Sequence, residues 1–217
     1  MPLTIANMSQ FSSDIYNEPR DIDVDTLNNL GPLRQMAGVW KGQRGLDVKP
    51  KLEGPKEQAF VERIELQPID PVTNGPQLLY GLRYHTQITK PDQIKTYHEQ
   101  VGYWLWEKET GTIIHTLTIP RGLVAMAAGK TTPDATKFEL VATEGLSTWG
   151  ICSTPFLDHA FKTVEFKISV TFNPDGTWSY EEDTVLRILG QADLFHHVDR
   201  NILTKVSEPT PNSLACQ

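Results

Sequence analysis

The segment "LFHHVDRN", residues 194–201, places His196 and His197 side by side in a stretch that otherwise reads as a β-strand. Successive side chains of a strand point to opposite faces, so one imidazole of the pair faces the interior. Imidazole is a common ligand of zinc and the proximal ligand of haem in several protein classes. Adjacent strand residues diverge and do not readily chelate one zinc ion, whereas haem needs only a single axial ligand. The pair therefore favours haem over zinc, and the spacing alone does not tell which histidine points inward.

Three further histidines, His85, His98 and His115, fall on predicted strands, where some of them must also point inward. A carboxylate such as Asp199 or Glu99 that accepts the second ring N–H of a ligating imidazole would fix its tautomer. The alternative is that these polar residues form an ordinary solvated and hydrogen-bonded strand end. The sequence leaves both interpretations open.

The common sequence signatures of enzymes are missing. We find no glycine-rich phosphate loop, no GxSxG, no HExxH and no paired CxxC. The segment "YEED" places Glu181 and Glu182 next to each other on a predicted strand, where they diverge rather than pair, and we interpret them as mostly surface charge. The sequence therefore identifies no catalytic residue.

The elements that must position these residues are almost all β-strands. "VEFKISVTF", residues 164–172, alternates apolar and polar side chains cleanly, and "NPDG", residues 173–176, is a strong hairpin turn. About ten such strands follow one another through mostly short connections, after one short helix at residues 30–38. Polar or small residues interrupt several inward-facing series, as expected of a cavity. The pattern predicts an all-β, antiparallel up-and-down barrel with a ligand pocket in its lumen.

The chain divides into three predicted regions. Residues 1–28 are polar and acidic, and we expect a flexible arm there. Residues 29–206 form a single barrel domain, since β-barrels of this length are common as one domain. Residues 207–217, "SEPTPNSLACQ", read as a disordered tail.

Composition limits which binding partners and which cellular compartment we expect. The formal net charge of the 217 residues is −7, and no basic stripe offsets it, which argues against a nucleic-acid partner. No apolar run approaches the roughly 20 residues of a membrane-spanning helix, and the first residues lack the features of a secretory signal. With only two cysteines, a cytoplasmic protein is the simplest prediction. The sequence is compatible with a homodimer.

Four segments together resemble a known family. "GVWKGQRG", residues 38–45, resembles the GxWxGxG signature of the nitrobindin-like, fatty-acid-binding-protein-like haem-binding β-barrels. "YHEQVGYW" (97–104), "IPRGLVAMAAGK" (119–130) and "HHVDRNILTKV" (196–206) are similar, in the same order, to that family's later strands. The resemblance covers roughly residues 30–206.

The resemblance implies a ten-stranded calycin-type barrel with a small helix plugging one end. Nitrobindins bind ferric haem b through one histidine of the last strand and are credited with isomerising peroxynitrite to nitrate, so the resemblance also implies the handling of peroxynitrite or nitric oxide. Carried onto this chain, it makes His197 the axial ligand of the haem iron, with His196 as the alternative. Tyr97, His98 and Ile119 match positions that border the nitrobindin cavity.

The chain also departs from the family pattern. Arg44 stands where the third glycine of GxWxGxG belongs. Extra residues occur around "QPIDPVTNGP" (67–76) and "TWGICSTPFLDHAF" (148–161), and a larger loop there could line the pocket mouth or close it. These departures affect the prediction of haem binding more than the prediction of the barrel fold.

Two alternatives to haem remain open. The first is a non-catalytic carrier of a fatty acid or similar hydrophobic molecule, in which Arg44, Arg83 or Arg187 with Tyr84 would anchor a carboxylate, since guanidinium binds carboxylates bidentately. The second is that interior polar residues merely satisfy one another around buried water. An unpaired inward imidazole would favour haem, and an inward Arg–Tyr pair would favour an acid.

Overall fold

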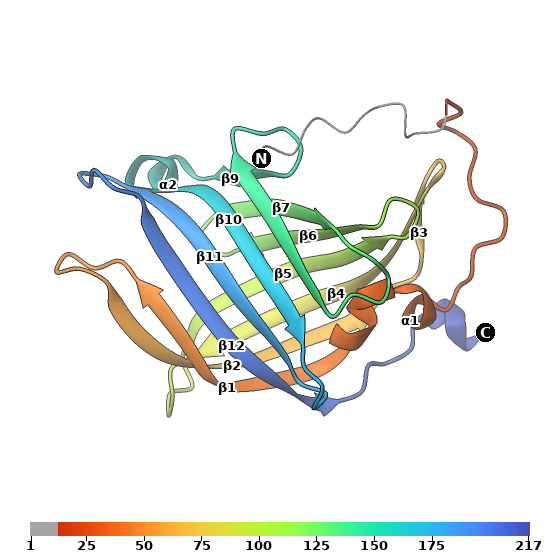
Figure 1. The fold of residues 1–217 in the computed structure, drawn as a ribbon, viewed down its shortest axis with the longest axis horizontal. Helices are drawn as coiled ribbons and strands as arrows, with labels where there is room; N and C mark the ends of the chain where they lie inside the picture. The colour runs from red at the N-terminus through yellow and green to blue at the C-terminus, as the bar shows by residue number, and fades with distance from the viewer. Residues whose placement is uncertain (1–12) are drawn as a thin grey trace.

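The dominant feature of the molecule is a closed β-barrel (Figure 1), seen in a computed structural model that describes residues 13–217. Within these residues the strands run β1 (Gly38–Lys49), β2 (Lys56–Pro68), β3 (Val72–Asn74), β4 (Gln77–Thr89), β5 (Thr96–Glu107), β6 (Thr112–Ile119), β7 (Leu123–Lys130), β8 (Lys137–Glu144), β9 (Gly150–Ser153), β10 (Phe161–Phe172), β11 (Trp178–Ile188) and β12 (Phe195–Ser207).

Ten of these twelve strands form the ring, each antiparallel to the next, and β12 pairs with β1 to close it. The other two are short: β3 extends β4 as a hairpin, and β9 lies between the ends of β7 and β8. The strands alternate as their sequences require. In β10, Phe166, Ile168, Val170 and Phe172 are buried in the barrel. The predicted all-β, up-and-down barrel of about ten strands is confirmed.

One end of the barrel is plugged by the segment before β1. It contains α1 (Thr26–Asn29) and the 3-10 helix η2 (Gly31–Met36), in the region where the sequence predicts one short helix. Leu30, Leu33 and Met36 are fully buried in the core. The indole Nε1 of Trp40 donates a 2.7 Å hydrogen bond to the Met36 carbonyl, so the motif tryptophan ties the plug to the first strand.

Two short helices lie outside the predicted elements. α2 (Pro155–Ala160) lies in the long connection before β10, and the 3-10 helix η3 (Ser213–Cys216) lies in the tail that the sequence predicts as disordered. In the structure the tail contacts the plugged end: Asn212 Nδ2 donates to the Val24 carbonyl at 2.8 Å and to Asp70 Oδ1 at 2.9 Å. No helix within residues 13–217 has the length and apolar character needed to cross a membrane.

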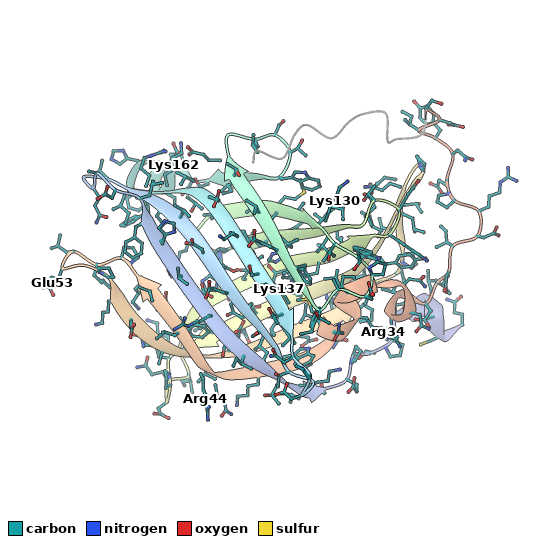
Figure 2. The ribbon with its side chains drawn as sticks, viewed as in Figure 1. Arg34, Arg44, Glu53, Lys130, Lys137 and Lys162 are labelled. Atoms are coloured by element: carbon teal, nitrogen blue, oxygen red, sulfur yellow. The ribbon has the colours of Figure 1, made fainter. Side chains whose placement is uncertain are left out.

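Strand β1 contains a β-bulge at the point where Arg44 stands in place of the third glycine of the GxWxGxG motif. Its pairing with β2 shifts by one residue between Gly42 and Gly45. As a result, Gly45 is the buried residue that takes the place of the third motif glycine, and Arg44 is exposed (Figure 2). A Cβ on Gly45 would lie 2.2 Å from the Phe60 ring, and one on Gly42 would lie 2.1 Å from Asn201 Nδ2. Both glycines are therefore needed because neighbouring side chains fill the space.

Candidate functional site

A cavity of about 440 Å³ occupies the unplugged half of the barrel. Pro50 and Lys51 of the β1–β2 connection and Leu157 of α2 line its mouth, and Trp104 and Trp178 line its inner end. Figure 1 shows α2 and the β1–β2 and β11–β12 connections together at this end, opposite α1. We call the region near these connections the outer half of the cavity and the region toward the plug the inner half.

The two adjacent histidines of β12 face opposite sides of the barrel wall. His197 lines the cavity, and 29% of its side chain is exposed. His196 points outward with 62% of its side chain exposed, and its Nδ1 lies 2.7 Å from Oδ2 of Asp183 on β11. The inward imidazole is therefore His197.

A chain of hydrogen bonds fixes the ring of His197. Its Nε2 lies 2.7 Å from Oδ1 of Asp47 on β1. Tyr97 donates to Asp47 Oδ2 at 2.7 Å, and Lys49 Nζ donates to the Tyr97 hydroxyl at 2.6 Å. Burial raises the pKa of Asp47, but the bonds from His197 and Tyr97 outweigh it and hold that pKa below its usual value. The carboxylate thus keeps the proton on Nε2, and Nδ1 has no partner among residues 13–217.

His98 is the second imidazole of the outer half, and it comes from β5 on another side of the barrel. Burial lowers its pKa, and the nearby positive charge of Arg121 acts in the same direction. The ring is therefore neutral near pH 7. Ile119 and Leu123 add apolar surface beside it.

Carboxyl groups from adjacent strands form a row across one wall of the cavity. Glu182 on β11 is the cross-strand partner of Asp199 on β12, which in turn is the partner of Asp47 on β1. All three line the cavity. We refer to Glu182, Asp199 and Asp47, together with Glu62 on β2, as the acidic wall.

Burial and mutual repulsion keep much of the acidic wall protonated. Burial raises the pKa of Glu62 to about 7, although hydrogen bonds from Tyr180 at 2.9 Å and Asn201 at 3.0 Å oppose the shift. Burial and the charge of Glu62 raise the pKa of Glu182 to about 8. The pKa of Asp199 is also raised, first by burial and then by Glu182. Like charges in a desolvated site cannot all ionise, so the wall holds shared protons at neutral pH.

Opposite the acidic wall, the inner half carries a hydrogen-bonded aromatic cluster. The Tyr84 hydroxyl accepts a 2.7 Å bond from Gln100 and lies 2.9 Å from His115 Nε2. The His115 ring stacks on Trp104 with centroids 3.8 Å apart. Burial lowers the pKa of His115 to about 3, so it carries no charge at neutral pH.

Comparison with known proteins decides the family. The model of the THAP4-like, heme-binding beta-barrel domain matches residues 29–205. The chain belongs to this family. The match extends from the plug to the end of β12 and includes both strands that join Asp47 to His197.

A solved structure gives the same fold for the THAP4-like barrel. The crystal structure of Rv2717c from M. tuberculosis aligns with a TM-score of 0.58 and 22% identity, covering 84% of this chain and 99% of that one. Among curated proteins, the comparison finds no match.

The structure brings some of the predicted site residues together and leaves others apart. His197, Tyr97, His98 and Ile119 all line the cavity, as the family resemblance implies, whereas His196 lies outside it. Of the groups predicted to anchor a fatty acid, Tyr84 lines the cavity. The three arginines are exposed on the outer surface of the barrel and do not line it: Arg44, Arg83 and Arg187.

Sequence reasoning missed the acidic wall and the partner of His197. The imidazole binds Asp47, rather than Asp199 or Glu99, and Glu99 instead lies 2.8 Å from His85. The interpretation of Glu182 as surface charge is wrong: it lines the cavity, while its neighbour Glu181 is exposed. The available signal was strand alternation, because Glu182 shares its face with residues 178 and 180, which are aromatic.

Proposed function

We propose that the outer half of the cavity binds haem b and that His197 ligates its iron. The observation that carries the proposal is the inward His197 ring, held by Asp47 on Nε2, while Nδ1 has no partner within the described part of the chain, residues 13–217. Family membership supports the same ligand class. A neutral imidazole oriented by a carboxylate is the usual arrangement of a metal-binding histidine.

The side chains of the outer half fit this group chemically. Haem is a flat, mostly apolar macrocycle that carries propionate carboxylates. The apolar surface comes from Ile119, Leu123 and Leu186, and the cations at the mouth, Lys49 and Arg121, suit the propionates. The inner half does not fit the macrocycle because Glu62 and Glu182 of the acidic wall line it. We therefore assign haem to the outer half alone.

The chain's own residues orient and tune the ligand. Asp47 fixes the His197 tautomer, and Tyr97 and Lys49 hold Asp47 in place. When bound, haem would supply a ferric iron able to react with small oxidants such as peroxynitrite. The handling of peroxynitrite or nitric oxide remains a proposal that rests on the resemblance.

Haemin titration of the purified protein tests the proposal. We expect a saturable Soret band in the wild type, its loss in His197→Ala, and its retention in the matched variant His196→Ala. The control is well matched because His196 is the adjacent residue on the same strand and faces outward. A wild-type spectrum that does not shift, or a shift that survives His197→Ala, would exclude this ligation.

The fatty-acid carrier remains the alternative if haemin does not bind. The observations do not favour it, since a deeply bound carboxylate would face the acidic wall and the proposed arginine anchors lie outside. The same titration, repeated with a fatty acid as competitor, separates the two ligands.

A further inference from the structure

Glu182 is an acid of the cavity wall that has no partner among residues 13–217. It lies deep in the barrel and lines the cavity, yet it makes no hydrogen bond or ion pair with any residue of the described chain, 13–217. Its closest charged neighbours, Glu62 and Asp199, are themselves acids. A desolvated acid whose neighbours are also acids gains from a positively charged partner, and a ligand of the cavity can supply one.

No cation of the protein compensates the inner acids. Lys49 lies 4.0 Å from Asp47 and serves that residue at the mouth. Among the described residues, none of the ion pairs includes Glu62, Glu182 or Asp199. These acids hold protons at neutral pH, and a cation that enters the cavity would supply the countercharge that lets one of them ionise.

The cavity has an acidic side and an apolar side. The acidic wall comes from four consecutive strands of the ring, β11, β12, β1 and β2. The strands across the barrel, β5 and β6, contribute Trp104 and His115 to the inner half, and burial keeps His115 neutral. A ligand that satisfies both sides carries a positive charge on an apolar body.

We propose that the inner half of the cavity binds an organic cation, an amine attached to an apolar chain or ring, with Glu182 and Glu62 as the groups that contact the ammonium. Charge-assisted hydrogen bonds from the ammonium would replace the missing partner of Glu182. On binding, a protonated carboxyl releases its proton to solvent, and the resulting carboxylate pairs with the ammonium. This proposal does not depend on haem, since it uses neither His197 nor the iron.

Calorimetric titration with three probes of equal chain length, decylamine, decanol and decanoate, tests the class of ligand. We expect decylamine to bind about tenfold more tightly than either of the others, corresponding to about 1.4 kcal/mol. Decanol or decanoate binding as tightly as decylamine would overturn the proposal, because the apolar chain would then account for all of the affinity.

Variants at neighbouring positions of one strand locate the site. Glu182→Gln keeps the shape and removes the charge, and we expect it to weaken decylamine about tenfold and to leave decanol unchanged. Glu181→Gln is the matched control on the outer face and should change neither probe. Equal decylamine affinity in wild type and Glu182→Gln would overturn the assignment. Glu62→Gln is the second variant, measured in the same way, in case the first does not fold.

Proton release gives an independent readout. Decylamine titrated at pH 7 in two buffers of different ionisation enthalpy should release about one proton per molecule bound, and decanol none. The titratable groups that face Glu182 are Glu62, Asp199, Tyr84 and Tyr180, and burial keeps the two tyrosines protonated at this pH by raising the pKa of each. Absence of proton release would contradict the pairing. The haem proposal fails separately, since His197→Ala should abolish the Soret band and leave decylamine binding intact.

Discussion

Asp47 and His197 are 150 residues apart in the sequence, and their side chains meet at 2.7 Å across the seam where β1 pairs with β12. The contact fixes which ring nitrogen carries the proton and leaves the other free toward the cavity. It also joins the two strands that close the barrel, so the site depends on complete closure.

Removing the charge of Asp47 should weaken haemin binding. Asp47→Asn keeps the shape of the side chain but no longer favours the proton on His197 Nε2 through its charge, so we expect affinity for haemin to fall about tenfold. Asp183→Asn is the matched control, because Asp183 holds the outward His196 in the same way. Absorption titration measures both, and equal affinity in Asp47→Asn and wild type would contradict the role of this carboxylate.

Glu182 should make the barrel less stable as the pH rises. Its pKa is raised from 4.5 to about 8, so between these values the native state holds a proton that the unfolded chain has lost. Unfolding free energy then falls with increasing pH. Relative to wild type, Glu182→Gln should gain at least about 1.4 kcal/mol in unfolding free energy between pH 5 and pH 9, the equivalent of one pKa unit.

Urea denaturation at several pH values between 5 and 9 measures this difference. The comparison with wild type cancels the shared groups that do not interact with Glu182, including His115, whose lowered pKa acts in the opposite direction below pH 6.5. The difference that remains belongs to Glu182 and its effect on the neighbouring acids Glu62 and Asp199. Glu181→Gln should follow the wild type. A Glu182→Gln curve parallel to the wild-type curve would show that the carboxyl is not held protonated.

A side chain added at Gly42 should displace Asn201, which donates a hydrogen bond to Glu62 of the acidic wall. The Cβ of Gly42→Ala would lie 2.1 Å from Asn201 Nδ2, the atom that donates to Glu62. We expect a loss of about 1–3 kcal/mol in unfolding free energy, typical of overpacking in a filled interior. Gln43→Ala, at an exposed position on the same strand, should change it by less than about 0.5 kcal/mol. Similar losses in the two variants would argue against the steric explanation.

The barrel could be predicted because its strands and turns have local sequence patterns. Alternation along residues 164–172 and the turn at 173–176 are properties of short segments, and each predicts its strand or hairpin without knowledge of the rest. α2 was missed because six residues beginning with Pro155 offer too little periodicity to separate a helix from a loop. The contacts of the tail with Asp70 link residues more than 140 apart in the sequence, and no local pattern indicates them.

The site was harder to predict because it depends on register between distant strands. Alternation shows that His196 and His197 point to opposite faces of β12. Which of these faces points into the barrel is determined only by the pairing of β12 with β1 and β11. The same holds for Glu182: its face could be inferred from neighbouring aromatics, while its lack of a partner could not. The bulge beside Arg44 is likewise visible only once β1 is paired with β2.

The pairing of β1 with β12 also determines when the barrel can close during folding. The first barrel strand stays without its second partner until residues 195–207 have been synthesised and have folded back on it. Until then the cavity has no complete wall, and neither His197 nor Asp199 has reached the lumen. Contacts this distant in sequence form slowly. A ligand that needs the complete cavity can therefore bind only after β12 has paired with β1.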